Sequence, residues 1–245
     1  LAEIDAASAV ERSFRHFDDV EAFFSGEVLV PGGPFTAGAV AQDGRAARNE
    51  APRQAETGDF YMDLHPVTNA LYGMYLEDTQ AEIFPEYWDN PRFNQPDQPV
   101  VGVSYAEAMR FAAWLSGQLG VVKRLPSEDE WEKAARGGGE VIYPWGDESP
   151  SDGPRANYNG NGRFEAASPV GSYENGKNPY GIYDMAGNVW ELTSTQQETG
   201  RLIAKGGSWM DGPADLRISN RREIDPSRGY VDVGFRLIRE VSNEE

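Results

Sequence analysis

NPYGIYDMAGNVWEL, at residues 178–192, is one of several motifs that dominate the second half of this chain. Working outward from it, RLPSEDEWEKAARGG (124–138) and YPWGDE (143–148) come before it, and KGGSW (205–209) and VGFRL (233–237) come after it. Each combines glycine or acidic residues with at least one aromatic residue, a composition typical of ordered loops around a binding or active site. The series therefore predicts a domain whose second half consists of short strands and long, structured loops.

Composition limits the classes of function. The chain has 245 residues, enough for one large domain with a small extension, and its net charge is −18. Such an acidic chain is poorly suited to nucleic acid or to anionic membranes, both of which attract basic surfaces. No apolar stretch approaches the roughly 20 residues that a membrane-spanning helix needs. The charge suits divalent cations or a basic protein partner, although solubility alone also explains it.

Cysteine is absent from the whole chain. Disulfide bonds, thiolate metal sites and thiol catalysis are therefore excluded. The same absence does not distinguish a cytoplasmic from a periplasmic protein, because proteins of both compartments can lack cysteine.

The chain is expected to consist of an extension and a main domain. In residues 3–24, apolar side chains recur at three- and four-residue spacings, which predicts a helix with one apolar stripe. We therefore expect a helical N-terminal extension over residues 1–26 and one domain over residues 27–245. The extension is expected to pack on that domain or to bind a partner.

The first part of the main domain predicts strands separated by polar segments. Residues 28–30 and 60–64 have the apolar and aromatic composition of short strands. The Pro- and Gly-rich segment 31–35 predicts a turn, and the polar segment 39–58 predicts a surface loop.

Three helices are predicted from their N-terminal caps. Thr68 or Asn69 begins a helix that reaches residue 78. Ser104 and Ser127 each precede a Glu at the third helical position, which is the capping-box pattern. In the last of these helices, Trp131 is expected to face the core.

Together the motifs resemble those of the formylglycine-generating-enzyme-like domain, also called the sulfatase-modifying-factor domain. Besides the five motifs above, PVTN (66–69), VVGVSYAEA (100–108) and GFR (234–236) stand in the family's order. The resemblance covers residues 27–240. It implies an α+β fold, a variant of the C-type-lectin-like fold with few helices, short strands and long ordered loops.

The resemblance implies structural calcium ions in the loop region. One family site uses the D-x-x-G-x-V-x-E part of the motif at 178–192, which matches Asp184, Gly187, Val189 and Glu191 here. Two carboxylates and two backbone carbonyls are the oxygen ligands that Ca²⁺ prefers. Ordinary turn chemistry is the alternative explanation of these residues.

A second family calcium site begins with an Asn and a backbone carbonyl, which match Asn157 and Tyr158. Its further ligands come from an Asp-Gly-aromatic turn, but the corresponding segment here reads NGRFE (161–165). The family's Asp is missing, so Asn161 or Glu165 would have to replace it. We therefore expect the first calcium ion and regard the second site as incomplete.

The resemblance also shows which chemistry is missing. Formylglycine-generating enzymes bind copper through two cysteines that lie two and seven residues after the aromatic residue of KGGSW. From Trp209, these positions are Asp211 and Leu216. Because Cu(I) prefers soft sulfur ligands, both the formylglycine-generating activity and a copper site are excluded.

The family also includes iron-dependent and oxidative enzymes. Iron-dependent sulfoxide synthases of the family use three histidines, whereas this chain has two, His16 and His65. His65 precedes a proline at the start of a helix, where capping or packing is expected. Oxidative tailoring enzymes, such as the protein that matures the pyoverdine chromophore, stay open as an alternative, with Asp211, Glu223 or Asp225 as acid–base groups.

Residues 210–232 correspond to the surface that binds substrate or varies within the family. Arginines here could bind a carboxylate or phosphate of a partner, or could pair internally with nearby acidic residues. The residues expected at a partner surface are Trp209, Asp211, Arg217, Arg221, Arg222 and Arg228.

The sequence therefore predicts a calcium-stabilised bacterial domain that has lost the copper–thiol site and acts as a binding or regulatory module. Its expected partner is a protein, for example the periplasmic part of a kinase or receptor. The more specific hypothesis is a periplasmic accessory protein that promotes threonine-kinase signalling in type VI secretion. A periplasmic or secreted location is expected, with the cytoplasm as the alternative. The other hypotheses are a tailoring oxidoreductase and the variable binding protein of a diversity-generating retroelement.

Overall fold

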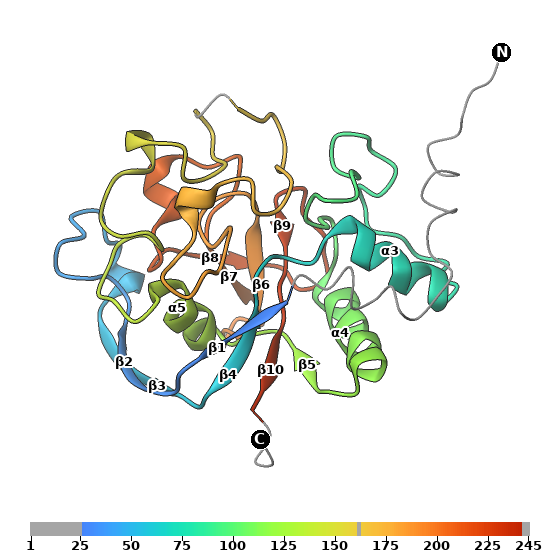
Figure 1. Cartoon of the computed structure of the whole chain (residues 1–245), viewed down its shortest axis with the longest axis horizontal. Coiled ribbons are helices and arrows are strands. Elements are labelled where there is room, and N and C mark those ends of the chain that lie inside the picture. Colours follow the sequence, from blue (N-terminus) through green and yellow to red (C-terminus); the bar gives the residue numbers. More distant parts are fainter. Residues whose placement is uncertain (1–25, 161–162, 242–245) are drawn as a thin grey trace.

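The computed structural model describes residues 26–160 and 163–241. The first sheet joins the two ends of this part of the chain (Figure 1). Its strands, in spatial order, are β1 (Glu27–Val30), β4 (Phe60–Asp63), β10 (Ile238–Glu240) and β5 (Lys123–Arg124). Because β1 and β10 both pair antiparallel with β4, the sheet closes the domain around its own termini.

A second sheet carries the motifs of the C-terminal half. Its strands, in spatial order, are β8 (Arg221–Ile224), β7 (Leu202–Lys205), β6 (Trp190–Gln196) and β9 (Val233–Gly234). The β6–β9 pair is parallel and the other pairs are antiparallel. The loops of residues 137–160 and 163–189 are seen on the side of β6, β7 and β8, in the upper left of Figure 1.

The helices begin where the caps predict. They are α3 (Asn69–Asp78), α4 (Tyr105–Leu119) and α5 (Glu128–Arg136). Thr68 caps α3, and Ser104 and Ser127 form capping boxes for α4 and α5. Trp131 of α5 is fully buried, as predicted. None of the helices in the described residues is long and apolar enough to span a bilayer.

The hairpin β2 (Gly33–Ala37) and β3 (Arg53–Thr57) corrects two predictions. The segment 31–35 is only partly a turn, and the segment 39–58 is not a loop throughout, because it contains β3 and a 3₁₀ turn at Arg48–Glu50. These strands lack an apolar alternation because α5 holds the hairpin through polar groups. Gly38 N–H donates to Glu132 Oε1 at 2.6 Å, and Gly38 O accepts from Arg136.

The two largest apolar clusters of the described residues lie in the interior. One surrounds α3 and α4, where the rings of Tyr72 and Phe111 stack at 5.2 Å and Phe235 packs edge-on against both. The other surrounds Trp131 and Met185. The predicted helix over residues 3–24 lies outside the described residues, which begin at residue 26. The N-terminal extension and the domain boundary at residue 27 therefore stay predictions.

Candidate functional site

The KGGSW turn and the residues after it form the centre of the candidate site. Asp211, at the first family cysteine position, is half-buried and firmly held. Its Oδ2 accepts hydrogen bonds from Trp190 Nε1 at 2.8 Å, from Ser208 N at 2.9 Å and from Ser208 Oγ at 2.5 Å. The carboxylate therefore closes the turn instead of projecting from the surface.

Leu216, at the second cysteine position, is fully buried. It packs in a cluster with Tyr143, Tyr158 and Ala186. An apolar side chain in the core offers no ligand atom to a metal ion.

Asp232 is a site residue that sequence reasoning missed. It is buried, and its Oδ2 accepts from Arg222 Nη1 at 2.7 Å and lies 3.4 Å from Ser208 Oγ, whose single proton goes to the closer Asp211. The guanidinium of Arg222 also lies 5.3 Å from the ring centre of Tyr230. Ser208 thus bridges two carboxylates, those of Asp211 and Asp232. The sequence signals that could have identified this pair are the place of Ser208 in KGGSW and the place of Asp232 directly before VGFRL.

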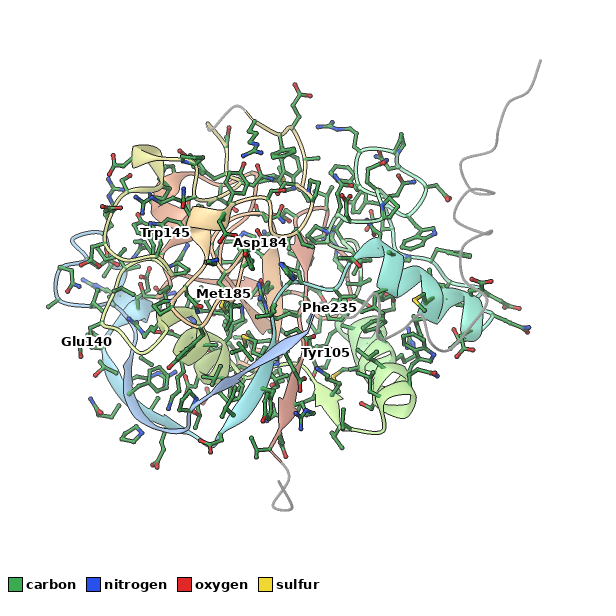
Figure 2. The ribbon with its side chains drawn as sticks, viewed as in Figure 1. Tyr105, Glu140, Trp145, Asp184, Met185 and Phe235 are labelled. Carbon is green, nitrogen blue, oxygen red and sulfur yellow. The ribbon has the colours of Figure 1, made fainter. Side chains whose placement is uncertain are left out.

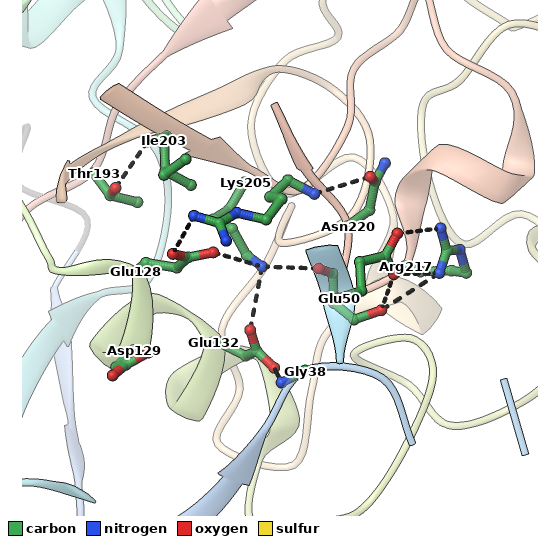
Figure 3. A network of polar contacts seen from close by, with 12 residues as sticks. Gly38, Glu50, Glu128, Asp129, Glu132, Thr193, Ile203, Lys205, Arg217 and Asn220 are labelled. Atoms are coloured by element: carbon green, nitrogen blue, oxygen red, sulfur yellow. Dashed lines mark hydrogen bonds and ion pairs between the residues drawn. The ribbon is translucent and has the colours of Figure 1, made fainter. Parts of the chain in front are cut away.

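Arg217 does not belong to the predicted partner surface. Only 5% of the residue is exposed, and its guanidinium pairs with Asp43 and Glu50 (Figure 3). Nη1 lies 2.7 Å from Asp43 Oδ2 and 2.5 Å from Glu50 Oε2. The 3₁₀ turn Pro213–Leu216 leads the chain inward at this point, so the alternative of internal pairing is confirmed for Arg217.

The remaining predicted surface residues differ in exposure. Arg221 pairs with Glu128 at 3.0 Å, so it is also engaged internally. Arg228 is exposed and lies beside the ring of Tyr230. Trp209 is half-buried against Phe93, with 6.0 Å between the ring centres. The Nε1 of Trp209 is buried without a hydrogen-bond partner in the described part of the chain.

The acid–base candidates beyond Asp211 lie apart from this network. Glu223 is exposed on β8. Asp225 Oδ1 accepts from the backbone N–H and the hydroxyl of Ser227, and the Ser227 hydroxyl bond lowers the pKa of Asp225. Neither carboxylate shows a contact with Ser208 or Asp232.

The two carboxylates of the first predicted calcium site are in different states. Glu191 is fully buried and accepts from Arg236 Nη2 at 2.6 Å, from Arg236 Nε at 2.7 Å and from Trp131 Nε1 at 2.7 Å. Asp184 is buried near the centre of the loops (Figure 2), and its Oδ2 accepts from Gly171 N–H at 2.7 Å. Burial raises the pKa of the Asp184 carboxyl to about 6. The negative charge of Glu191 is therefore paired with Arg236, whereas Asp184 has no cationic partner in the described residues.

The backbone of the same motif has the tight geometry that the site requires. Gly187 has a φ of +77°, and a Cβ there would lie 2.4 Å from Asn157 O. Val189 is buried beside Phe93. A side chain at Gly187 would thus separate the two predicted calcium segments, which the structure brings together.

The second predicted site has one unsatisfied ligand atom. Asn157 is buried and donates from Nδ2 to Ala166 O at 2.8 Å, but its Oδ1 has no partner in the described residues. The Tyr158 ring is buried in the cluster around Leu216. Glu165 lies in an exposed position, and Asn161 is outside the described residues.

These oxygens fit a hard cation. A buried amide oxygen without a donor and a buried carboxylate without a cationic partner are atoms that Ca²⁺ can satisfy. Within the described residues, no group of three or more His, Asp or Glu side chains surrounds a common point, so backbone carbonyls would have to complete either site. Glu191 fits less well, because Arg236 and Trp131 occupy both of its oxygens.

His65 lies beside this region. Its ring stacks on Tyr183 at 4.9 Å, and its Nδ1 is buried without a partner in the described ranges. Burial, with a smaller contribution from Arg236, lowers the pKa of His65 to about 4. The imidazole is therefore neutral at pH 7, consistent with the predicted packing role.

Comparison with known proteins identifies the family. The model of the sulfatase-modifying factor enzyme 1-like domain matches residues 14–241. The chain belongs to this family. Within it, the mouse protein described as inactive C-alpha-formylglycine-generating enzyme 2 is 32% identical and aligns with 85% of this chain and 84% of its own length.

A bacterial kinase and a solved structure are also similar to this chain. The serine/threonine-protein kinase pkn1 of Chlamydia pneumoniae is 31% identical over 88% of this chain, but the chain covers only 38% of that kinase. The structure of PvdO from Pseudomonas aeruginosa superposes with a TM-score of 0.78 at 28% identity, covering 88% of this chain and 94% of PvdO. The α+β, C-type-lectin-like fold expected from the motifs is confirmed.

Proposed function

We propose that this member of the family is a calcium-stabilised binding module without catalytic activity. The carrying observation is the state of the two family cysteine positions. Asp211 is held by three hydrogen bonds, and Leu216 is part of the core. The description of the mouse relative as inactive supports the proposal.

The proposed partner surface is smaller than the one the sequence predicts. It consists of Trp209, the exposed Met210 and Arg228, since Arg217 is buried and Arg221 and Arg222 are paired. An aromatic ring, a flexible thioether and a guanidinium that has no ion pair in the described residues suit a protein surface that carries apolar and acidic groups.

A narrower version of this proposal is a role beside a kinase. The family domain of a chlamydial serine/threonine kinase resembles this chain. We propose a periplasmic or secreted protein that promotes threonine-kinase signalling in type VI secretion. A co-purification experiment with the periplasmic part of the cognate kinase tests it, with Trp209→Ala and Arg228→Ala in combination as the variant that should lose the partner.

Elemental mass spectrometry of protein purified without added metal tests the proposed function. One or two calcium ions per chain and no copper or iron are expected. A chelator should lower the melting temperature, and re-added Ca²⁺ should restore it. Stoichiometric iron or copper would contradict the non-catalytic assignment.

The second candidate function is an oxidoreductase that tailors a peptide or siderophore. The observation that favours it is the bridge from Asp211 through Ser208 to Asp232, beside the half-buried Trp209. Two buried or half-buried carboxylates near an aromatic wall could exchange protons with a substrate. Turnover that disappears in Asp232→Asn, while the calcium content stays unchanged, would favour this candidate.

A further inference from the structure

A pocket of about 450 Å³ lies between the β2–β3 hairpin and the C-terminal end of α5. The two elements lie side by side in Figure 1. Side chains of Pro34, Phe35, Lys133 and Tyr180 contribute to its lining, together with the backbone around Gly138. The volume is in the range of small-molecule sites.

This pocket is separate from the candidate site described above. None of its lining residues belongs to the network of Ser208, Asp211 and Asp232. In Figure 2, Glu140 of its lining lies at the edge of the molecule, away from Asp184. A ligand here would therefore leave the loops around Asp184 free.

Lys133 is the unusual residue of the lining. Only 9% of it is exposed, and its ammonium donates to Gly33 O and lies 5.4 Å from the centre of the Phe35 ring. In the described part of the chain, no carboxylate comes within ion-pair distance of it. Burial also lowers the pKa of Lys133, and the more distant carboxylates of Asp59 and Glu56 offset this effect only in part.

The other buried cations make the contrast clear. Each has a carboxylate oxygen 2.6 to 3.2 Å away; they are Lys123, Arg136, Lys205, Arg217 and Arg236. A chain with 40 acidic residues thus pairs these cations but leaves Lys133 beside a cavity. The missing counter-charge is what a ligand can supply.

The lining also restricts the kind of anion. The two terminal nitrogens of Arg136 are bonded to Glu132 and to the carbonyl groups of Gly38 and Val141, so Lys133 supplies the positive charge that lacks an ion pair in the described residues. Arg136 Nε, which is buried without a hydrogen-bond partner there, is one further donor. One cation suits a monoanion better than a phosphate, which carries up to two charges and needs more donors. Proline and aromatic walls favour a flat apolar body next to that anion.

We propose that the pocket binds an organic carboxylate with an aromatic or similarly flat apolar body. The carboxylate pairs with the ammonium of Lys133, and the body lies against Phe35, Pro34 and Tyr180. The ligand is either a small free acid or the C-terminal carboxylate of a peptide that ends in an aromatic residue. The inference is independent of the proposed function, because it concerns other residues.

Calorimetric titration with 3-phenylpropionate tests the proposal. Its neutral amide, 3-phenylpropionamide, and inorganic phosphate are the matched ligand controls. The acid should bind at least about tenfold more tightly than the amide, because it forms a charge-assisted hydrogen bond with the ammonium of Lys133. Phosphate should bind more weakly than the acid.

Lys133→Met should abolish this preference and leave the weak binding of the amide unchanged. Lys177→Met is the matched control, because the same substitution outside the pocket should retain the preference. Equal binding of acid and amide, an unchanged affinity in Lys133→Met, or tighter binding of phosphate would overturn the proposal. The melting curve of each variant shows whether it is folded.

A second titration distinguishes the two sources of the carboxylate. N-acetyl-Gly-Gly-Phe with a free C-terminus is compared with its amidated form. Tighter binding of the free peptide than of 3-phenylpropionate assigns the pocket to peptide C-termini, and the reverse order assigns it to small acids. Failure of both acids to bind would sink the inference and leave the proposed module function untouched.

Discussion

Two buried polar regions of this domain stabilise their charges in different ways. Around Lys205 and Arg217, basic side chains face carboxylates directly, as Lys205 faces Glu132 at 3.2 Å and Arg217 faces Glu50 at 2.5 Å (Figure 3). Around Asp184, by contrast, a buried carboxylate has a backbone N–H as its donor and no cationic partner in the described residues.

The difference separates what the chain stabilises alone from what it leaves to a ligand. A buried charge is tolerated only when it is paired or bound. The network around Arg217 meets this requirement with its own side chains. The loops around Asp184 and Asn157 instead leave a buried carboxylate without a cationic partner and a buried amide oxygen without a donor in the described residues, so we propose the calcium ion there and not in the network.

The largest effect is expected from breaking the self-contained network. Arg217→Ala leaves Asp43 and Glu50 buried without their cation, so the free energy of unfolding should fall by about 3–5 kcal/mol. Urea unfolding measures it, with Arg228→Ala as a control that changes stability by less than about 0.5 kcal/mol. The loss should be the same with and without calcium. A loss of unfolding free energy that appears only in chelator would show that the network around Arg217 depends on calcium, as the loops around Asp184 are proposed to do.

Removal of calcium should have the next largest effect. At a free concentration one hundred times the dissociation constant, bound Ca²⁺ adds about 2.7 kcal/mol. For a domain of this size that corresponds to a fall in melting temperature of roughly 5–10 °C when a chelator is added.

Asn157→Ala and Asp184→Ala identify the oxygens that carry this effect. Each should reduce the shift that chelator causes, whereas Glu191→Gln should destabilise the protein in chelator as well, because it weakens the pair with Arg236. An undiminished chelator shift in both alanine variants would place the calcium elsewhere.

A smaller effect concerns acid pH. Since burial lowers the pKa of His65 to about 4, the unfolded chain binds its proton at a higher pH than the folded domain does. The contribution of His65 to stability is therefore complete above about pH 6.5 and is lost as the pH falls toward 4. Because His65 is partly exposed, we expect this contribution to the free energy of unfolding to be about 2 kcal/mol.

The measurement is the difference in unfolding free energy between the wild type and His65→Gln at pH 7 and at pH 4.5. The difference should narrow or change sign at the lower pH, because glutamine does not titrate. A difference that stays constant between the two pH values would show that His65 titrates normally in the folded state.

The smallest effect is expected at the unpaired cation. Lys133→Met removes an ammonium that has no buried counter-charge, so the free energy of unfolding should change by less than about 1 kcal/mol. This result would contrast with Arg217→Ala, since the two residues have similar burial. A loss as large as that of Arg217→Ala would mean that Lys133 has a structural partner.

Much of the fold could be predicted because its signals are local. The caps Thr68, Ser104 and Ser127 act on backbone groups a few residues away, so their helices begin as expected. The hairpin could not be predicted in the same way. Its strands are polar, and Gly38 is held by Glu132, a residue 94 positions further along the chain.

The candidate site shows the same limit. The motifs located Asp211 and Leu216 and excluded the copper–thiol chemistry, because a missing side chain is visible in any sequence. They did not reveal that Ser208 joins Asp211 to Asp232.

By itself, the sequence determined the family, the α+β fold, the helix starts and the loss of the two cysteines, since each depends on residue identity or on short spacings. Only the tertiary structure decided which charges are paired. Arg217 and Glu50 are 167 positions apart, and nothing near either residue in the sequence indicates their contact. Whether a buried charge is neutralised or left for a ligand depends on its neighbours in space, and these are set by the packing of the whole domain.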